Sequence, residues 1–153
     1  MYLASLLLLL LVLPVSCIVG EALWYGGAPD LVLLVGKWLV FWAVGARLFL
    51  AGIRQVLQPQ FTAEHIFAIK ETAALPIVRE VGFGNLAMGA LGLATLAAPP
   101  LMVPAAIVGG LYYGLAGVGH LVRGRLNFEG WTALASDFFI FIVLAVFVDS
   151  VGF

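Results

Sequence analysis

The sequence predicts an all-α membrane protein, a bundle of five transmembrane helices with one short amphipathic helix at the cytoplasmic surface. Apolar residues make up 64% of the 153 residues and charged residues 10%, whereas soluble proteins average about 45–50% and about 25%. The apolar residues gather in five stretches, each near the roughly 20 residues that cross a bilayer as a helix. None shows the alternation of a transmembrane β-strand. This composition excludes a soluble domain, a disordered chain and a nucleic-acid-binding protein.

The five predicted spans form a single transmembrane domain over residues 1–153. In chain order, the spans cover residues 2–20, 31–53, 81–98, 101–119 and 131–148. Pro99 and Pro100 cannot continue a helix. They therefore predict a tight turn that makes the third and fourth spans an antiparallel hairpin.

The first span has an alternative interpretation as a signal peptide, whose removal would leave four transmembrane helices. Its start lacks the Lys or Arg of such a signal, and no small-x-small cleavage site follows the leucine run. The segment from Pro14 to Cys17 is similar to a lipoprotein cleavage site, but Pro14 stands where an aliphatic residue is required. We therefore expect the first span to be retained.

The basic residues of the loops predict the orientation of the chain. They lie between the second and third spans, at Arg54, Lys70 and Arg79, and between the fourth and fifth, at Arg123 and Arg125. Cytoplasmic loops are enriched in Lys and Arg. We therefore expect these two loops and the N-terminus in the cytoplasm, with the C-terminus outside.

The long loop between the second and third spans contains a helical pattern of its own. Thr62 is a suitable N-cap, Glu64 follows in the first turn, and apolar residues recur at helical spacing. This pattern predicts an amphipathic helix over residues 62–75, lying in the cytoplasmic interface. The alternative is a regulatory or partner-docking segment that does not touch lipid.

Three charged residues lie within the predicted spans, where an unpaired charge is costly. Lys37 is expected to extend its side chain outward toward Asp30. Arg47 and Asp137 each lie six residues inside the cytoplasmic end of their spans, which places both about 9 Å deep. We expect these two side chains to meet, either as a structural contact or as part of a ligand or proton site.

A stripe of small residues marks the third span. Gly82, Asn85, Gly89 and Gly92 recur at spacings of three and four residues, so they share one helix face. Such a stripe favours close packing against a neighbouring helix, with Asn85 bonding across the interface. The alternative is a groove that admits a flat ligand or a lipid tail.

Five polar residues are expected at one level of the membrane, toward its cytoplasmic side, and we call them the polar slab. They are Arg47, Glu80, Asn85, His120 and Asp137. The polar slab is a candidate ligand-binding or structural cluster, and no catalytic residue is assigned to it.

The sequence carries no signature of a metal, cofactor or nucleophilic catalytic site. Its two histidines lack the spacing and neighbouring carboxylates of a metal site. Cys17 is the one cysteine, which excludes an internal disulfide and a paired-cysteine redox motif. We therefore expect no metal and no cofactor.

Two segments carry a family resemblance: residues 45–52 (Gly-Ala-Arg-Leu-Phe-Leu-Ala-Gly), and residues 79–86 (Arg-Glu-Val-Gly-Phe-Gly-Asn-Leu) followed by Gly89 and Gly92. The region that contains them, residues 36–98, resembles the DoxX-like superfamily of small bacterial membrane proteins, which typically have four helices. Residues 59–64 (Pro-Gln-Phe-Thr-Ala-Glu) indicate a narrower, uncharacterised family within or near it. The resemblance implies the bacterial inner membrane and a non-catalytic role beside quinone-linked or thiol redox complexes. The chain departs from that pattern in its fifth span, its long cytoplasmic loop and its lack of redox cysteines.

These observations favour a non-enzymatic membrane protein, either an accessory subunit or a binder of a lipid or quinone. The expected partners are the lipid bilayer and another membrane protein or a second copy of the chain, and not nucleic acid. One alternative is an oligomeric transporter or channel for small solutes, which requires a water-filled path. Another is a membrane enzyme acting on a lipid or quinone, which requires an apolar cleft that reaches the polar slab.

Overall fold

The computed structural model describes residues 2–25, 30–124 and 126–152, and these residues form helices and connecting turns without a β-strand. The predicted all-α bundle is confirmed. Arg125, one of the basic residues used to orient the chain, lies outside the described residues.

The N-terminal half consists of two long helices, each interrupted by a π-helical segment. The first is α1 (Tyr2–Leu7), η1 (Leu8–Val12) and α2 (Leu13–Tyr25); the second is α3 (Leu31–Leu39), η2 (Val40–Arg47) and α4 (Leu48–Leu57). The C-terminal half has three uninterrupted helices, α6 (Leu75–Ala94), α7 (Met102–Arg123) and α8 (Phe128–Ser150).

Four helices of the described residues are long and apolar enough to cross a membrane. They cover Leu3–Tyr25, Leu31–Leu57, Pro99–Arg123 and Phe128–Ser150. The remaining long helix, α6, contains Arg79, Glu80 and Asn85, and these polar residues lower its hydropathy. α6 nevertheless runs along the same stretch of the bundle as η2 and α4, because Gly92 packs against the Gly45 backbone and Gly82 packs against Gly52.

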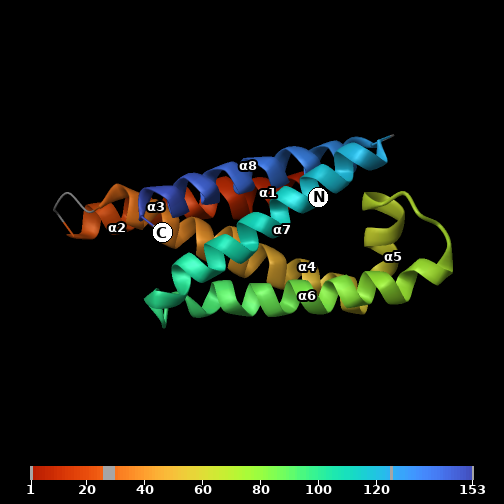
Figure 1. Ribbon diagram of the computed structural model, residues 1–153, viewed down its shortest axis with the longest axis horizontal. Coiled ribbons are helices and arrows are strands. Elements are labelled where there is room, and N and C mark those ends of the chain that lie inside the picture. The colour runs from red at the N-terminus through yellow and green to blue at the C-terminus, as the bar shows by residue number, and fades with distance from the viewer. Residues whose placement is uncertain (1, 26–29, 125, 153) are drawn as a thin grey trace.

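The helices form an elongated bundle (Figure 1). α6 lies alongside α4 at one edge, α8 lies along the opposite edge near α1, and α7 crosses diagonally between them. The connection from α6 to α7 passes through the short 3₁₀ helix η5 (Pro99–Leu101). The turn predicted from Pro99 and Pro100 is therefore present.

The helices extend further than the apolar pattern indicated. α2 continues to Tyr25, α4 to Leu57 and α7 to Arg123, and α8 begins at Phe128. Side-chain caps and prolines set several of these ends, because they satisfy or remove backbone N–H groups that have no partner within the helix. Asn127 Oδ1, for example, accepts a hydrogen bond from the Gly130 backbone N–H in the first turn of α8. The Asp30 carboxylate caps the start of α3 in the same way.

The amphipathic helix expected over residues 62–75 is shorter in the structure and begins earlier. Pro59 opens α5 (Pro59–Phe61), which continues into the π-helical η3 (Thr62–Ile66). Thr62 is therefore inside the helical segment and not its N-cap. The helix ends because Ala68 adopts a left-handed conformation with φ 55°, which is unfavourable for a residue with a Cβ. The chain returns to helical geometry at η4 (Thr72–Ala74), directly before α6.

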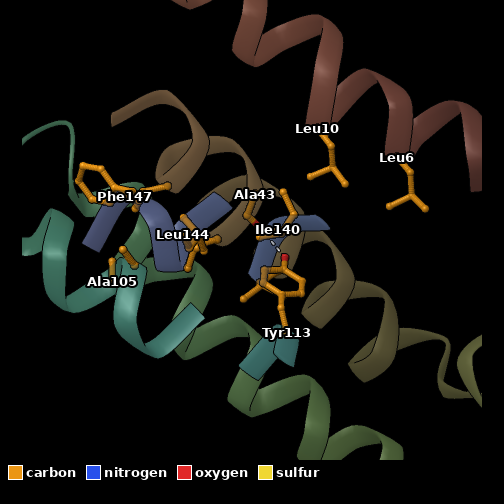
Figure 2. Close-up of a cluster of buried hydrophobic side chains, with 12 residues drawn as sticks. Leu6, Leu10, Ala43, Ala105, Tyr113, Ile140, Leu144 and Phe147 are labelled. Carbon is orange, nitrogen blue, oxygen red and sulfur yellow. Dashed lines mark hydrogen bonds between the residues drawn. The ribbon is translucent and has the colours of Figure 1, made fainter. Parts of the chain in front are cut away.

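The apolar core lies where η2 meets α7, α8 and the first long helix. Val40, Val44, Ile140 and Leu144 are fully or almost fully buried there. The Tyr113 hydroxyl donates a hydrogen bond to the Ala43 carbonyl at 2.5 Å (Figure 2). This bond satisfies a polar group inside the core, and it fixes α7 to the π-helical segment.

Candidate functional site

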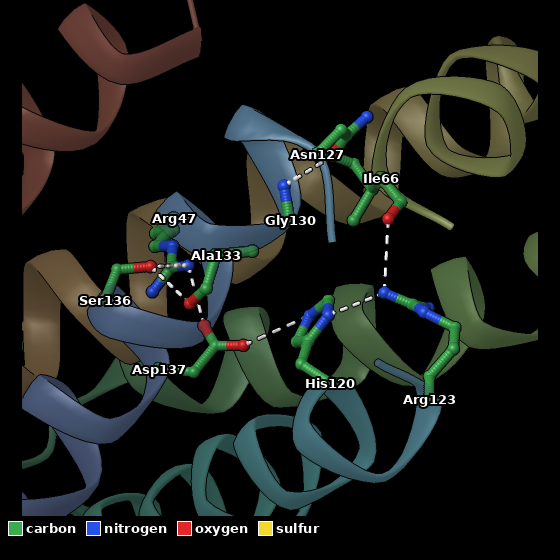
Figure 3. A network of polar contacts seen from close by, with 9 residues as sticks. All are labelled: Arg47, Ile66, His120, Arg123, Asn127, Gly130, Ala133, Ser136 and Asp137. Atoms are coloured by element: carbon green, nitrogen blue, oxygen red, sulfur yellow. Dashed lines mark hydrogen bonds and ion pairs between the residues drawn. The ribbon is translucent and has the colours of Figure 1, made fainter. Parts of the chain in front are cut away.

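Arg47 and Asp137 form an ion pair inside the bundle, as their equal depth predicted. Arg47 Nη2 lies 2.9 Å from Asp137 Oδ1, and the two side chains are 11% and 8% exposed. The same nitrogen donates to Ser136 Oγ at 3.0 Å (Figure 3). The guanidinium also lies 4.8 Å from the centre of the Tyr113 ring. The pair is therefore held by α8 on one side and by an aromatic side chain of α7 on the other.

Arg47 and Asp137 lie further from the ends of their helices than the predicted spans indicated. Arg47 is ten residues before the end of α4 at Leu57, and Asp137 is nine residues after the start of α8 at Phe128. At 1.5 Å per residue these separations correspond to about 15 Å and about 13 Å. The two charges remain at one level because both helices extend by a similar length.

His120 of α7 connects the ion pair to the α5–η3 end of the bundle. Its Nε2 lies 3.8 Å from Asp137 Oδ2, and its Nδ1 lies 2.7 Å from Arg123 Nη2. A guanidinium only donates hydrogen bonds, so Nδ1 accepts and the proton of the neutral ring is assigned to Nε2, facing Asp137. Arg123 Nη2 also donates to the Ile66 carbonyl at 3.2 Å. Figure 3 shows this series of contacts from Arg47 to Ile66.

The structure brings together three of the five residues of the polar slab. Arg47, His120 and Asp137 are in contact, as described above. Asn85 is buried, but its Nδ2 donates to Gln55 Oε1 at 2.7 Å, so it belongs to a separate amide pair between α6 and α4. Glu80 is exposed on α6 and does not line the cavity described below. It does not join the other residues of the slab, because it lies two residues from the buried Gly82 and so points to the opposite side of the helix.

A cavity of about 330 Å³ adjoins the ion pair. It lies between α1, α4, α7 and α8, with α5 and η3 at one end. Its polar wall is formed by Arg47, Gln55, Asn85, His120 and Asp137. Leucines of α1, η1 and α4 and aromatic residues of α7 and of the α5–η3 region supply much of the rest of the lining. An apolar cavity with a few convergent polar groups is the usual form of a small-molecule site.

Gln55 is the principal residue of the cavity that the sequence did not indicate. The predicted second span stopped at residue 53, so Gln55 was assigned to a loop. In the structure it is buried on the last turns of α4. The signal that could have found it is its spacing of eight residues from Arg47, which places both on one face of a continuing helix.

Lys37 is paired with a different carboxylate from the one expected. Its Nζ lies 2.8 Å from both oxygens of Glu21, and Trp38 Nε1 donates to Glu21 Oε2 at 2.8 Å. Asp30 caps α3 instead. This second ion pair joins α2 to α3 at the end of the bundle remote from the cavity, and its side chains are more exposed, at 36% and 20%.

The stripe of small residues on α6 is a packing surface. A Cβ added to Gly89 would lie 2.5 Å from the Phe49 backbone nitrogen, and one added to Gly82 would lie 2.9 Å from Gln55 Cβ. The backbones of η2 and α4 therefore fill the space beside the stripe. The alternative of a ligand groove along Gly82, Gly89 and Gly92 is excluded.

Comparison with known proteins found no matching family model, no characterised protein and no solved structure. The residues of the cavity and their geometry are therefore the basis for inferring a function.

Proposed function

We propose that this chain is a small integral membrane protein that binds an amphiphilic molecule, a lipid or a quinone-type compound, in the cavity beside Arg47 and Asp137. The observation that carries the proposal is the cavity itself. Its volume of about 330 Å³ is at the lower end of the range of about 300–1,000 Å³ found for ligand pockets. Such a volume suits the head group of an amphiphile and not a whole lipid.

The position of the cavity argues against a purely structural role for the polar residues. Protein interiors are close-packed, and an empty cavity lowers stability in proportion to its size. If Arg47, His120 and Asp137 served only to hold helices together, larger side chains at Ala116 or Ala133, both in the cavity wall, would close the space. A retained cavity with polar walls supports ligand binding.

Ligand binding is tested by purification of the chain in native lipid nanodiscs, followed by solvent extraction and mass spectrometry of the bound molecules. We expect one lipid or quinone species to be enriched over the surrounding membrane. Ala116→Phe places a larger side chain in the cavity and should abolish the enrichment. Ala90→Phe is the matched control, because Ala90 is exposed on α6 and does not line the cavity. Equal lipid profiles for wild type and both variants would contradict the proposal.

We further propose that the protein lies in the bacterial inner membrane, with the α5–η3 end of the bundle in the cytoplasm. The basic residues Arg54, Lys70 and Arg79, and Arg123 after them, support this orientation. Reporter fusions after residues 70 and 124 should be active only as cytoplasmic reporters, and a fusion at the C-terminus only as an external one. An externally active reporter at residue 124 would reverse the orientation.

An accessory role beside another membrane protein, as the DoxX-like resemblance implies, is compatible with ligand binding. Co-purification of a second membrane protein or of a second copy of the chain would support that role. The transporter and enzyme alternatives stay predictions from the sequence.

A further inference from the structure

We propose that the cavity receives its ligand from the lipid bilayer through a gap between α1 and α4, with an uncharged, hydroxyl-bearing head group inward and the apolar tail outward. This inference rests on the proposed binding function and specifies the route and the chemistry of the ligand. Three features carry it: a closed cytoplasmic end, an opening lined by lipid-facing residues, and a buried amide pair at the inner wall.

The α5–η3 segment closes the end of the cavity nearest the water. Phe61, Ile66 and Phe67 line the cavity from this side, while Thr62 and Ala63 are buried. The Arg54 guanidinium lies 3.4 Å from the centre of the Phe61 ring, which in turn stacks on His65.

Two hydrogen bonds hold this segment against the other side of the bundle. Arg123 donates to the Ile66 carbonyl at 3.2 Å (Figure 3), and Asn127 donates to the His65 carbonyl at 2.8 Å. The segment is thus fixed at the C-terminal end of η3, beside the aromatic residues that line the cavity, which makes a direct path from water unfavourable.

The opening of the cavity lies between α1 and α4. Ser5 and Leu50 both line the cavity and are both exposed, Leu50 at 52%, and the partly exposed Leu9 lies beside them in the lining. α1 and α4 belong to helices long and apolar enough to span a membrane. Side chains exposed on the outer surface of such helices face lipid. An apolar tail that leaves the cavity past Leu9 and Leu50 therefore remains in the bilayer.

The inner wall offers a buried hydrogen-bond acceptor, Asn85 Oδ1, that the described residues do not use. Asn85 Nδ2 donates to Gln55 Oε1. Among the described residues, the buried Asn85 Oδ1 then has no hydrogen-bond partner. Two paired amides leave one carbonyl oxygen and one NH₂ group over, whichever way the two amides are oriented. A hydroxyl group both donates and accepts, so it satisfies either arrangement.

The charges of the cavity favour an uncharged head group. Arg47 and Asp137 balance each other at 2.9 Å, and a further charge brought into this low-dielectric site would lack a counter-charge. Arg54 lines the cavity but is exposed at the end of α4, where it lies near the membrane surface. The polar head therefore meets the amide pair, and the ion pair stays intact.

The route is tested with a single thiol placed in the cavity wall. In a Cys17→Ser background, Ala116→Cys is reconstituted in liposomes and treated either with N-dodecylmaleimide, which stays in the bilayer, or with a charged methanethiosulfonate in the water. We expect the bilayer reagent to label the thiol and the charged reagent to react at least tenfold more slowly. Ala133→Cys, on α8 in the same wall, serves as a second position should the first variant fold poorly.

Narrowing the opening gives the matched control. Leu50→Trp and Leu9→Trp should each slow labelling by the bilayer reagent by at least fivefold. Ile53→Trp should leave it unchanged, because Ile53 is also exposed on α4 but does not line the cavity. Faster labelling by the charged reagent, labelling by neither reagent, or an equal effect of all three tryptophans would overturn the inference. These labelling measurements need no native ligand. The proposed route can therefore be refuted while a ligand still co-purifies, and the route can be supported when no ligand co-purifies.

The chemistry of the head group is tested by how well a bound compound protects the same thiol from labelling. 4-Nonylphenol carries a hydroxyl group, and 4-nonylanisole is the same molecule with that hydroxyl methylated. We expect the phenol to protect at a concentration about tenfold lower, since a site with unpaired buried polar groups discriminates strongly against an analogue that cannot donate. Asn85→Leu should reduce the difference to less than about twofold. Equal protection of the unaltered site by both compounds, or protection by neither, would refute this part of the inference.

Discussion

Replacing either member of the Arg47–Asp137 pair is expected to lower the free energy of unfolding by about 3–5 kcal/mol, because it leaves the other charge buried without its partner. Arg47→Met and Asp137→Leu make these changes with apolar side chains of comparable size. The double replacement should cost much less than the sum of the two single ones, since it leaves neither charge stranded. The measurement is reversible unfolding in mixed micelles, arranged as a double-mutant cycle.

The second ion pair of the chain supplies the control for this cycle. Lys37 and Glu21 are 36% and 20% exposed, against 11% and 8% for Arg47 and Asp137. Lys37→Met and Glu21→Leu should therefore show a coupling energy of only about 0–1 kcal/mol. If the losses at Arg47 and Asp137 simply added, the ion pair would contribute nothing to stability beyond its separate members.

The other large effect is expected at Gly89, where two helix backbones touch. In Gly89→Ala, the new Cβ would lie 2.5 Å from the Phe49 nitrogen and 2.7 Å from the Phe49 Cα. Backbone atoms cannot rotate out of the way, so α6 must move away from α4, at a cost near the upper end of the range of about 1–3 kcal/mol for overpacking. The same movement would separate Asn85 from Gln55 and alter the wall of the cavity.

Gly84→Ala is the matched control for this substitution. Gly84 is on the same helix with nothing within 4 Å of an added Cβ, and alanine is the better helix former by about 1 kcal/mol. The Gly84→Ala variant should therefore be as stable as the wild type or more stable in the same unfolding measurement. A stable Gly89→Ala variant would mean that the α4–α6 contact is looser than described.

The sequence was a good guide to the bundle and to the ion pair, for physical reasons that can be named. Apolar length identified the helices, because crossing a bilayer requires about 20 apolar residues whatever the tertiary packing. Arg47 and Asp137 could be paired from depth alone because the errors at the two helix ends were nearly equal. The true ends lie four residues beyond residue 53 at Leu57 and three residues before residue 131 at Phe128.

Three other features could not be predicted from the depth of a residue along its helix. Glu80 shares the approximate level of the polar slab but lies on the wrong face of α6, which the position of Gly82 could have revealed. Asp30 was the nearest carboxylate to Lys37 along the chain, yet it is occupied in capping α3. The end of the α5–η3 helix at Ile66, followed by the left-handed Ala68, had no signal in the sequence, because glycine or asparagine usually occupies such a left-handed position.

The π-helical segment η2 has a consequence for how this chain tolerates changes in length. Each residue of an α-helix turns the chain by about 100°, and a π-helical turn accommodates one residue more than an α-helical turn does. Lys37 lies before η2 and reaches Glu21, whereas Arg47 lies at its end and reaches Asp137. Loss of one residue within η2 would restore α-helical geometry and leave both ion pairs facing their partners, whereas loss of a residue from a regular α-helical segment would rotate one pair by about 100°. Homologues that keep both pairs should therefore have either this number of residues from 37 to 47 or one residue fewer, with a regular α-helix in place of η2.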